Sequence, residues 1–338
     1  MGFPRFPAGV PLVAAVGLAL LVTGCTSAKT GGSDNAADTS GGTVSIGLVT
    51  KTNSNPYFVK LRESAQAEAD KKGAKLVALA GKFDGDNQGQ VDAINNLVAQ
   101  NVKGILITPS SSTGVLSAIK AARDKGIIVI ALDTATEPAN AVDATLATDN
   151  KAAGVTQGKY VKAALGDQKP EIVLLDGTPG STVDDLRHNG FLEGFGLTAD
   201  SPEVKGTAVT NGDQTKAQTA MENLYQRNPG INAVYTINEP AAAGAAQALT
   251  GKKSSVVIGS IDGSCAGVRN VKDGKFAATV MQFPKKMAQQ GVDAVVDYAK
   301  NKKKPSGFID TGSQLITDKA VPGLDSKDTA WGLKNCWG

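Results

Sequence analysis

The feature that most restricts the fold of this chain is a regular alternation of two patterns from residue 44 onward. Short runs rich in Val, Ile and Leu alternate with longer stretches in which apolar residues recur at helical spacing. In "VDAINNLVAQ", for example, Val91, Ile94, Leu97 and Val98 fall on one face of a helix. Such alternation predicts βαβ units, and therefore parallel sheets with right-handed crossovers.

The predicted strands are short and apolar throughout. Runs such as "GILIT" and "GIIVIAL" lack a polar face, as expected of strands covered by helices on both faces of a sheet. The predicted strands cover residues 44–50, 75–80, 104–108, 127–132, 144–148, 171–176, 204–209, 233–236, 256–261 and 277–281. The predicted helices cover residues 57–72, 88–100, 115–125, 151–164, 213–227, 240–249 and 285–300.

The first residues indicate export and are not part of this pattern. Met1 to Pro11 carries one Arg, and Leu12 to Val22 is an apolar run of signal-peptide length, shorter than the roughly 20 residues of a membrane span. The run ends in "LVTGC", which is similar to a bacterial lipobox, in which the Cys (here Cys25) is acylated and becomes the first mature residue. An ordinary secretory signal with a chance Cys is the alternative.

Composition predicts a tether after the signal sequence, and length predicts the number of domains. Residues 25–42 are rich in Ser, Gly, Asp and Ala and lack large apolar residues, so they predict a flexible tether. About 295 residues follow the tether. A single hydrophobic core rarely supports a chain of that length, so two domains are expected.

The charge balance and the scarcity of reactive side chains exclude several classes of function. Removal of residues 1–24 takes away only Arg5 and leaves 34 basic against 32 acidic residues, a balance that argues against a nucleic-acid surface. His188 is the single histidine and is expected to face solvent from a helix; the chain has no GxSxG motif. We therefore expect that the protein binds no metal or cofactor and is not an enzyme. The alternative that remains is a glycosidase in which Asp133 and Asp262 are the catalytic carboxylate pair.

Two cysteines follow the lipobox. In an exported chain, Cys265 and Cys336 are expected to form a disulfide, with two free or buried thiols as the alternative.

Polar residues follow nearly every predicted strand. In open parallel sheets, ligands bind beyond the carboxyl ends of the strands, so these positions are candidate site residues. Each of them alone is equally typical of a turn or a helix N-cap, but they recur in both halves of the chain, and basic residues are almost absent from these positions. They are Asn55, Ser110, Asp133, Asp149, Asp176, Asn211, Asn238, Glu239, Asp262 and Gln282.

Several of these positions lie in segments that resemble a known family. The segments are "NSNPYF", "ALDTATEP", "ATDN", "TVDDLRHNGFLEGFG", "NEPAAAGAAQAL", "IDGSCAGVRNV" and the terminal "NCWG". They resemble periplasmic sugar-binding proteins of the ribose-binding type, over residues 44–338. Within that group the chain is most similar to the fructose-binding subfamily of ABC-importer lipoproteins, because "INEPAAAGA", "DGSCAGV" and "CWG" are fairly specific to it.

The resemblance implies a fold of two similar doubly wound α/β domains joined by a three-strand hinge, the type I periplasmic binding protein or Venus-flytrap fold. The chain would cross between the domains near Asp149, Gln282 and Ser313. The expected organisation is a lipoprotein signal peptide at residues 1–24, a tether at 25–42, one sugar-binding lobe at 43–148 plus 282–312, and a second at 149–281 plus 313–338.

The resemblance also implies roles for residues of the first lobe. Asn55 would bind a sugar hydroxyl, and Tyr57 and Phe58 would cover the apolar C–H face of the ring, although both could instead be core residues of the first helix. Asp133 would accept hydrogen bonds from two sugar hydroxyls. Thr134 stands where ribose binders have Arg, so ribose itself is a less suitable ligand.

In the second lobe, Asn238, Asp262 and Gln282 match ligand positions of the family. Asn211 or Gly212 falls where ribose binders place an aromatic residue, so the second aromatic face of the sugar site is expected to be missing. The ligand Arg of ribose binders aligns with Asp185, while Arg187 lies two residues on, a rotation of about 200° on a helix. Both residues remain candidates.

The function that the resemblance implies is a substrate-binding lipoprotein of an ABC sugar importer. It would be exported, attached by its lipid to the outer face of the cytoplasmic membrane, and monomeric. Its partners would be a fructose-like monosaccharide and a permease with a cytoplasmic ATPase, and nucleic acid would not be among them. The alternatives are a linear sugar alcohol from tetritol to hexitol, an aldopentose, or a role as a chemoreceptor's ligand carrier. A sugar-responsive repressor would need a helix-turn-helix where this chain has an export signal.

Overall fold

The computed structural model describes Gly2, residues 43–252 and residues 256–338. The predicted signal peptide (beyond Gly2), the tether and the acylation site at Cys25 lie outside the described residues. Among the helices that the structure describes, none combines the length and the apolar character needed to cross a membrane.

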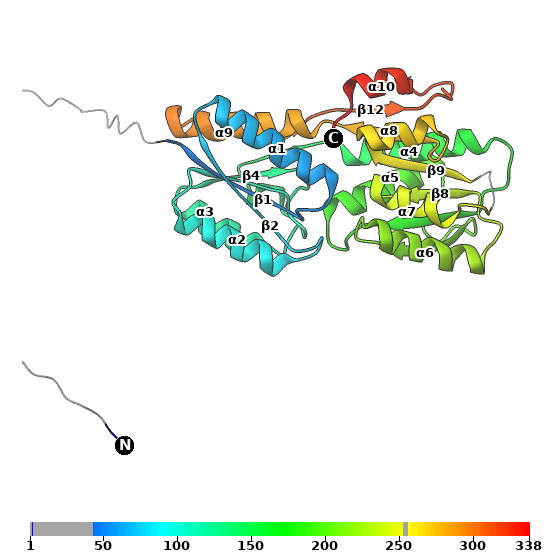
Figure 1. Cartoon of the computed structure of the whole chain (residues 1–338), viewed down its shortest axis with the longest axis horizontal. Coiled ribbons are helices and arrows are strands. Elements are labelled where there is room, and N and C mark those ends of the chain that lie inside the picture. The colour runs from blue at the N-terminus through cyan, green and yellow to red at the C-terminus, as the bar shows by residue number, and fades with distance from the viewer. Residues whose placement is uncertain (1, 3–42, 253–255) are drawn as a thin grey trace, which may run out of the picture. The chain divides into compact units, whose positions relative to one another are not determined.

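A six-stranded parallel sheet forms the centre of what we call the first lobe (Figure 1). Helices α1 and α9 cover one face of this sheet, and α2 and α3 cover the other. The strand order is β11-β5-β4-β3-β1-β2, with β1 Ser45–Thr50, β2 Lys75–Ala80, β3 Gly104–Ile107, β4 Ile128–Leu132, β5 Ala144–Ala147 and β11 Gly307–Asp310. The helices are α1 Pro56–Lys71, α2 Asn87–Ala99, α3 Leu116–Asp124 and α9 Pro284–Asn301, with a 3-10 turn η1 at Ala139–Ala141.

A seven-stranded sheet forms the centre of the second lobe. Its order is β13-β12-β10-β9-β8-β6-β7, with β6 Ile172–Asp176, β7 Val204–Val209, β8 Ala233–Thr236, β9 Val257–Asp262, β10 Ala278–Gln282, β12 Ser313–Ile316 and β13 Ser326–Lys327. Its helices are α4 Asn150–Leu165, α5 Thr182–Phe195, α6 Gln214–Arg227, α7 Glu239–Ala248, α8 Cys265–Lys272 and α10 Thr329–Asn335. The helices again cover both faces, so each lobe has a buried apolar layer on either side of its sheet.

The chain passes between the two lobes three times. Strand β5 belongs to the first sheet and is followed by α4 of the second lobe, and β10 of the second sheet is followed by α9, which packs on the first sheet. Strand β11 then returns to the first sheet and β12 to the second, where it pairs antiparallel with β10. This architecture confirms the predicted fold class of two doubly wound α/β domains.

All ten predicted strands and seven predicted helices occur, with bounds that differ by at most one residue. Helices α5, α8 and α10 and strands β11, β12 and β13 were not among the predicted ranges, although Asp185, Arg187 and His188 were expected to lie on a helix. Helices α8 and α10 and the three strands have at most eight residues each, so they are shorter than the window over which apolar periodicity is recognised, and all four residues of β11 are exposed.

Helices α4 and α5 approach each other through glycines. A Cβ on Gly154 would overlap the carbonyl oxygen of Arg187, and one on Gly158 would overlap that of Phe191. On the facing helix, a Cβ on Gly194 would meet the carbonyl oxygen of Val155. Only glycine permits this backbone-to-backbone contact, and the contact fixes α5, which carries Arg187, against α4.

Candidate binding site between the two lobes

A pocket lies between the lobes, at the carboxyl ends of both sets of strands, where an open parallel sheet places its ligand. Eight of the predicted site residues line it: Asn55, Tyr57, Phe58, Asp133, Arg187, Asn238, Asp262 and Gln282. The other lining residues are Lys51, Asp84, Gly177, Thr178, Ser181, Val183, Asp184, Gly212 and Ile237.

The aromatic part of the pocket comes from the start of α1. Asn55 caps this helix by accepting a hydrogen bond from the main-chain nitrogen of Tyr57 (3.0 Å), and Pro56 occupies the first helical position. Tyr57 and Phe58 are buried, and their rings meet edge to face with centroids 5.6 Å apart. Burial, followed by the nearby charge of Asp133, raises the pKa of Tyr57 well above its usual value. Both side chains also line the pocket, so each of them is a buried residue and a pocket residue at the same time.

Asp133 and Arg187 form the charged centre of the pocket. Asp133 has φ 64°, a left-handed conformation that Asp tolerates better than most residues, and its Oδ2 accepts a hydrogen bond from the Thr134 hydroxyl (3.0 Å). The guanidinium of Arg187 approaches Asp133 Oδ1 at 3.9 Å. Two further bonds fix this guanidinium, from Nε to Asn150 Oδ1 (2.8 Å) and from a terminal nitrogen to the carbonyl of Ile237 (2.9 Å).

The second lobe contributes a chain of amides and carboxylates. Gln282 Nε2 donates to Asp262 Oδ1 (3.0 Å), and Asp262 Oδ2 accepts from the main-chain nitrogen of Glu239 (3.2 Å). Asn238 caps α7 by accepting from the Ala241 nitrogen (3.0 Å), while its Nδ2 donates to the Gly212 carbonyl (3.2 Å). Burial, followed by the charge of Glu239, raises the pKa of Asp262 well above its usual value.

Glu239 is buried but does not line this pocket. Its two oxygens accept hydrogen bonds from the nitrogens of Gly263 (2.9 Å) and Ser264 (3.0 Å) and from the hydroxyl of Thr279 (2.8 Å). Burial raises its pKa. These bonds join α7 to the start of α8 and to β10, so the observed contacts of Glu239 hold the lobe together.

Four other predicted residues also lie outside the pocket lining. Thr134 is fully buried behind Asp133, and Asp149 is exposed and caps α4 through the Ala152 nitrogen (2.9 Å). Asp185 is exposed on the outer side of α5, because two positions on a helix turn it away from Arg187. Asn211 borders a second, outer cavity beside the pocket, so no aromatic side chain enters the pocket from that position.

The expectation that His188 faces solvent is wrong in part. The ring is half-buried, and its Nδ1 lies 2.8 Å from Asp176 Oδ1. It also meets Tyr235 edge to face, with centroids 6.1 Å apart. The hydrogen bond to Asp176 raises the pKa of the imidazole because it stabilises the protonated form.

Sequence reasoning missed three charged residues of the pocket. Lys51 directly follows β1 and is 5% exposed, Asp84 lies in the loop after β2, and Asp184 stands one position before Asp185 on α5. The carboxylate of Asp184 accepts from the Gly177 nitrogen (2.7 Å), yet burial raises the pKa of this side chain to about 7. The position of Lys51 directly after β1 is the sequence signal that could have identified it.

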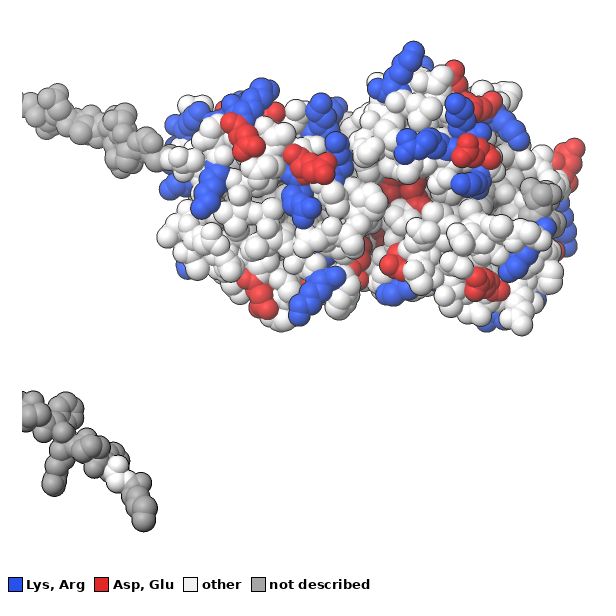
Figure 2. Space-filling model, viewed as in Figure 1, with Lys and Arg blue, Asp and Glu red and all other residues white. Residues whose placement is uncertain are grey.

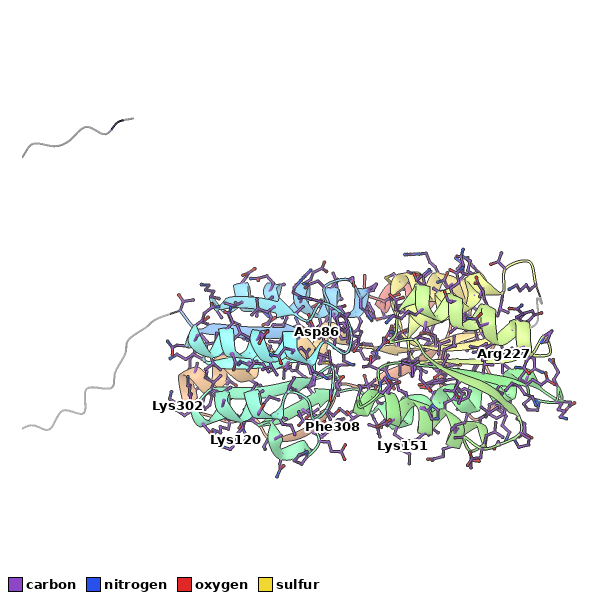
Figure 3. The ribbon with its side chains drawn as sticks, turned by 90° about the horizontal axis from the view of Figure 1, so that it is seen from below. Asp86, Lys120, Lys151, Arg227, Lys302 and Phe308 are labelled. Carbon is purple, nitrogen blue, oxygen red and sulfur yellow. A yellow bond between two sulfur atoms is a disulfide. The ribbon has the colours of Figure 1, made fainter. Side chains whose placement is uncertain are left out.

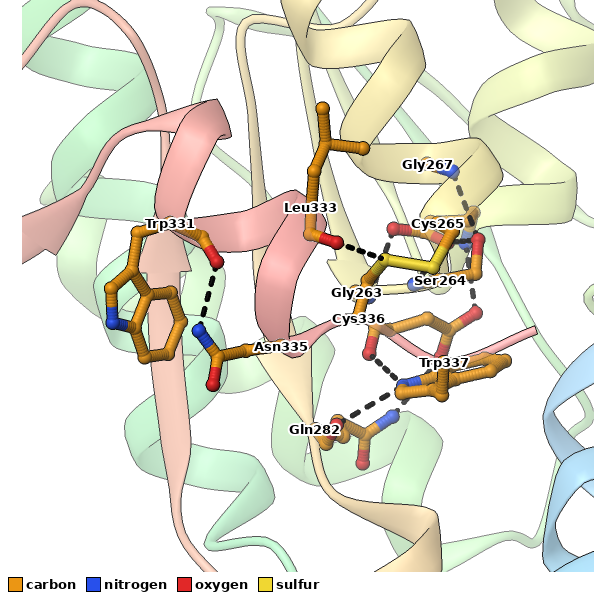
Figure 4. The surroundings of a disulfide bond; sticks show 12 residues. Gly263, Ser264, Cys265, Gly267, Gln282, Trp331, Leu333, Asn335, Cys336 and Trp337 are labelled. Atoms are coloured by element: carbon orange, nitrogen blue, oxygen red, sulfur yellow. Dashed lines mark hydrogen bonds between the residues drawn. A yellow bond between two sulfur atoms is a disulfide. The ribbon is translucent and has the colours of Figure 1, made fainter.

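The C-terminal tail supplies a further aromatic residue that the sequence analysis did not assign to the site. Cys265 and Cys336 form the predicted disulfide, which connects the tail to the start of α8 (Figure 4). Next to it, Trp337 Nε1 donates to the main-chain oxygens of Asp262 (3.2 Å) and Gln282 (3.1 Å), as Figure 4 shows for Gln282. The indole packs edge to face against Tyr57 of the first lobe, with ring centroids 5.6 Å apart. The tail thus supports two residues of the pocket and contacts a third.

The lobes also contact each other directly at the edge of the pocket. Ser112 of the first lobe donates its main-chain N–H to Gly180 of the second (2.9 Å), and its hydroxyl oxygen accepts from the Thr182 nitrogen (2.9 Å). The Thr182 hydroxyl donates to Ala135 (2.9 Å). These bonds join the two lobes and enclose the pocket between them.

The charge in and around the groove differs from that of the outer faces. Figure 2 shows acidic side chains inside the groove between the lobes, while lysine and arginine are scattered over the outside. Lys120 and Lys302 lie on the first lobe and Lys151 and Arg227 on the second (Figure 3). Within the part of the chain that the structure describes, no cluster of three or more His, Cys, Asp or Glu side chains could hold a metal ion.

The hydrogen-bonding capacity of the pocket is incompletely used. Within the described residues, Gln282 Oε1 and Asp84 Oδ1 are buried acceptors without a partner. A buried acceptor without a partner costs free energy, so both atoms favour a ligand that brings hydroxyl or amide donors. The adjacent Tyr57 and Phe58 rings offer faces for apolar C–H groups.

Comparisons with known proteins agree with this arrangement. A family model described as a periplasmic binding protein domain matches residues 46–303. The chain is 31% identical over 264 residues to the D-allose-binding periplasmic protein of Escherichia coli (76% of this chain, 85% of that protein). It is 34% identical over 261 residues to the ribose import binding protein of Salmonella typhimurium (76% and 86%).

A solved structure gives the same result for the fold. An ABC transporter solute binding protein from Agrobacterium vitis with bound D-fucose superimposes with a TM-score of 0.77 at 26% identity, covering 87% of this chain and 100% of that one. The chain belongs to the periplasmic binding protein family, in the group that includes the ribose- and allose-binding proteins.

Proposed function

We propose that the protein binds a neutral monosaccharide in the pocket between its lobes and delivers it to the permease of an ABC importer. The observation that carries this proposal is the composition of the pocket, in which carboxylates and amides from both lobes surround two aromatic rings. A sugar hydroxyl both donates and accepts hydrogen bonds, so it matches a carboxylate and an amide equally well. The apolar C–H face of a sugar ring matches an aromatic face.

The family supports the same ligand class. The two relatives described above are named for allose and ribose, and the similar solved structure contains D-fucose. All three are neutral sugars. We therefore infer a binding protein and not an enzyme, and we expect a sugar incubated with the purified protein to be recovered unchanged.

The division of the pocket between the lobes gives a mechanism. Asp133, Tyr57 and Phe58 belong to the first lobe, whereas Arg187 and Asp262 belong to the second. Only the state in which the lobes touch can satisfy both sets of contacts, so a bound sugar shifts the equilibrium toward that state. A permease could then distinguish the loaded protein by its closed form.

D-Fructose is the first candidate, because "INEPAAAGA", "DGSCAGV" and "CWG" resemble the fructose-binding subfamily. One observation favours a linear sugar alcohol as the second candidate. The aromatic side chains that line the pocket, within the described residues, all come from the first lobe, so a ring would be covered on one face only. An acyclic polyol does not need two flat faces.

The location of the protein is part of the proposal. The apolar run before Cys25 and the "LVTGC" sequence support export, acylation of this cysteine and attachment to the outer face of the cytoplasmic membrane. The experiment is replacement of Cys25 by Ala in cells fed a labelled fatty acid. Label in the wild-type protein and none in the variant supports the anchor, while equal label in both contradicts it.

The ligand is tested by a thermal-shift screen of hexoses, pentoses and polyols, followed by calorimetric titration. A ligand that binds only the native state raises its apparent stability. Asp133→Ala and Asp262→Ala should each weaken binding at least tenfold, because a hydrogen bond to a charged group contributes about 1.5–3 kcal/mol. Asp92→Ala, which removes an exposed carboxylate from α2, is the matched control.

Two results would contradict the proposal. If no compound of the panel raises the melting temperature of the wild-type protein, the proposal that its ligand is a sugar or polyol is wrong. A loss below twofold at both Asp133 and Asp262, in variants that remain folded by circular dichroism, would place the ligand elsewhere.

A further inference from the structure

Lys51 is a buried cation whose hydrogen-bonding capacity is largely unused. Its side chain is 6% exposed and lines the pocket between the lobes. The ammonium donates one long hydrogen bond, to the hydroxyl of Ser181 across the lobe boundary (3.4 Å), and lies 3.8 Å from Asp84 Oδ2. A lysine ammonium has three donors, and burying a charge with so few partners is unfavourable.

Asp84 presents the complementary group beside it. While Oδ2 faces Lys51, Oδ1 is buried and lacks a hydrogen-bond partner in the described part of the chain. The main-chain oxygen of Asp84 accepts a bond of 3.4 Å from Asn211 of the second lobe. The loop that carries this carboxylate is therefore in contact with the opposite lobe, and the carboxylate lines the same pocket as Lys51.

A hydroxyl group is the ligand group that fits both residues. It accepts a hydrogen bond from the ammonium and at the same time donates one to the free carboxylate oxygen. A carboxylate on the ligand would accept from Lys51 but would face Asp84 beside it and Asp133, which line the same pocket. Like charges close together in a buried site repel strongly, so a neutral hydroxyl is favoured over an acid.

We propose that Lys51 and Asp84 together bind one hydroxyl group of the sugar and thereby determine which sugars the protein accepts. This inference rests on the proposed function and goes beyond the residues that the family resemblance supplies. A sugar without that hydroxyl leaves a buried ammonium and a buried carboxylate oxygen unpaired, so it is rejected. Lys51 and Asp84 therefore select for the presence of a hydroxyl at one defined carbon.

The test combines Lys51→Met with single-deoxy sugars. Methionine keeps the long aliphatic stem and removes the ammonium. Calorimetry would measure binding of D-fructose, D-ribose and D-allose and of their single-deoxy analogues to the wild type and the variant. We expect Lys51→Met to weaken binding of the parent sugar at least tenfold. One analogue, which lacks the hydroxyl held by Lys51, should bind the wild type weakly and lose less than twofold in the variant.

Asp84→Asn provides the second variant, because it removes the free acceptor and keeps the size of the side chain. This variant should also bind the parent sugar more weakly than the wild type does. For the deoxy analogue that lacks the hydroxyl held by Lys51, its affinity should again be within twofold of the wild-type value. Lys103→Met is the matched control, since Lys103 is an exposed lysine directly before β3 and its replacement changes the net charge equally. Its affinities should match those of the wild type.

The outcomes separate this inference from the proposed function. If the wild type binds no compound of the hexose, pentose and polyol panel, the proposed function fails and this inference fails with it. If the wild type binds a sugar and Lys51→Met weakens all analogues equally, Lys51 acts on the contact between the lobes and not on a hydroxyl. A folded Lys51→Met variant with unchanged affinity also overturns the inference, because water then satisfies the pair.

Discussion

At the residue scale, the pocket contains an acid whose ionisation opposes folding. Asp184 is 7% exposed, and burial raises its pKa to about 7, with Asp176 and Asp84 adding to the effect. Lys51 and the hydrogen bond from the Gly177 nitrogen act in the opposite direction without cancelling it. Because the pKa is higher in the folded protein than in the unfolded chain, the protonated form is the one that favours folding.

Asp184→Asn should therefore stabilise the sugar-free protein at pH 8. A pKa near 7 in place of 3.8 costs roughly 4 kcal/mol once the group is ionised, and this cost develops as the pH rises from about 4 to 7. Asparagine keeps the oxygen that accepts from the Gly177 nitrogen and carries no charge. Urea unfolding at pH 4.5 and pH 8 measures the difference. An advantage of the variant that is equal at both pH values would contradict the raised pKa.

At the element scale, the contact between α4 and α5 positions the charged centre of the pocket. Gly158 of α4 lies against the main chain of α5, where an added Cβ would overlap the carbonyl oxygen of Phe191 and lie 2.8 Å from the nitrogen of Phe195. Asn150 at the start of α4 accepts the hydrogen bond of Arg187 on α5. Any separation of the two helices therefore moves the guanidinium relative to Asp133.

Gly158→Ala should destabilise the protein by about 2 kcal/mol or more, because main-chain atoms cannot yield to the new methyl group. Gly291→Ala in α9 is the control, since its Cβ would meet the ends of the Leu106 and Leu132 side chains, at 3.1 Å and 3.3 Å, and alanine favours a helix. We expect a change below about 1 kcal/mol there. Thermal and urea unfolding compare the two variants, and equal stability losses would show that the backbone contact is unimportant.

At the scale of the whole molecule, two lobes built from discontinuous segments meet around one pocket. Tyr57 of the first lobe contacts Trp337, which the disulfide and two indole hydrogen bonds attach to the second. The chain has two tryptophans, and the other, Trp331, is half-buried on α10. Opening of the lobes must separate Tyr57 from Trp337, so Trp337 is placed to report the closure.

Tryptophan emission should therefore change when a sugar closes the lobes, and Trp337 should produce most of the change. The Trp331→Phe variant should keep the response to D-fructose, or to whichever sugar of the screen binds. Trp337→Phe should lose most of it. Titration by fluorescence, with calorimetry to establish that each variant still binds, makes the comparison. A response that disappears with Trp331 would instead place the change on α10, away from the lobe boundary.

Local sequence patterns were sufficient to predict the order of helices and strands along the chain. Apolar periodicity depends on neighbours within a few residues, so it located strands such as residues 75–80 and helices such as residues 88–100 almost to the residue. Helix capping is equally local, and for that reason polar residues at strand ends, such as Asn55 and Asn238, could be found before their pocket was known. The family resemblance added that the two halves of the chain enclose one ligand.

Which of these side chains meet depends on how distant segments of the chain pack in three dimensions. Asp184 and Arg187 enter the pocket and Asp185 does not, because the rotation of α5 is fixed by its glycine contact with α4. Lys51 belongs to the pocket because the second lobe closes over it, and Trp337 contacts Tyr57 because a disulfide spanning 71 residues brings the tail there. Such contacts join residues far apart in the chain, and no local pattern encodes the distance between them.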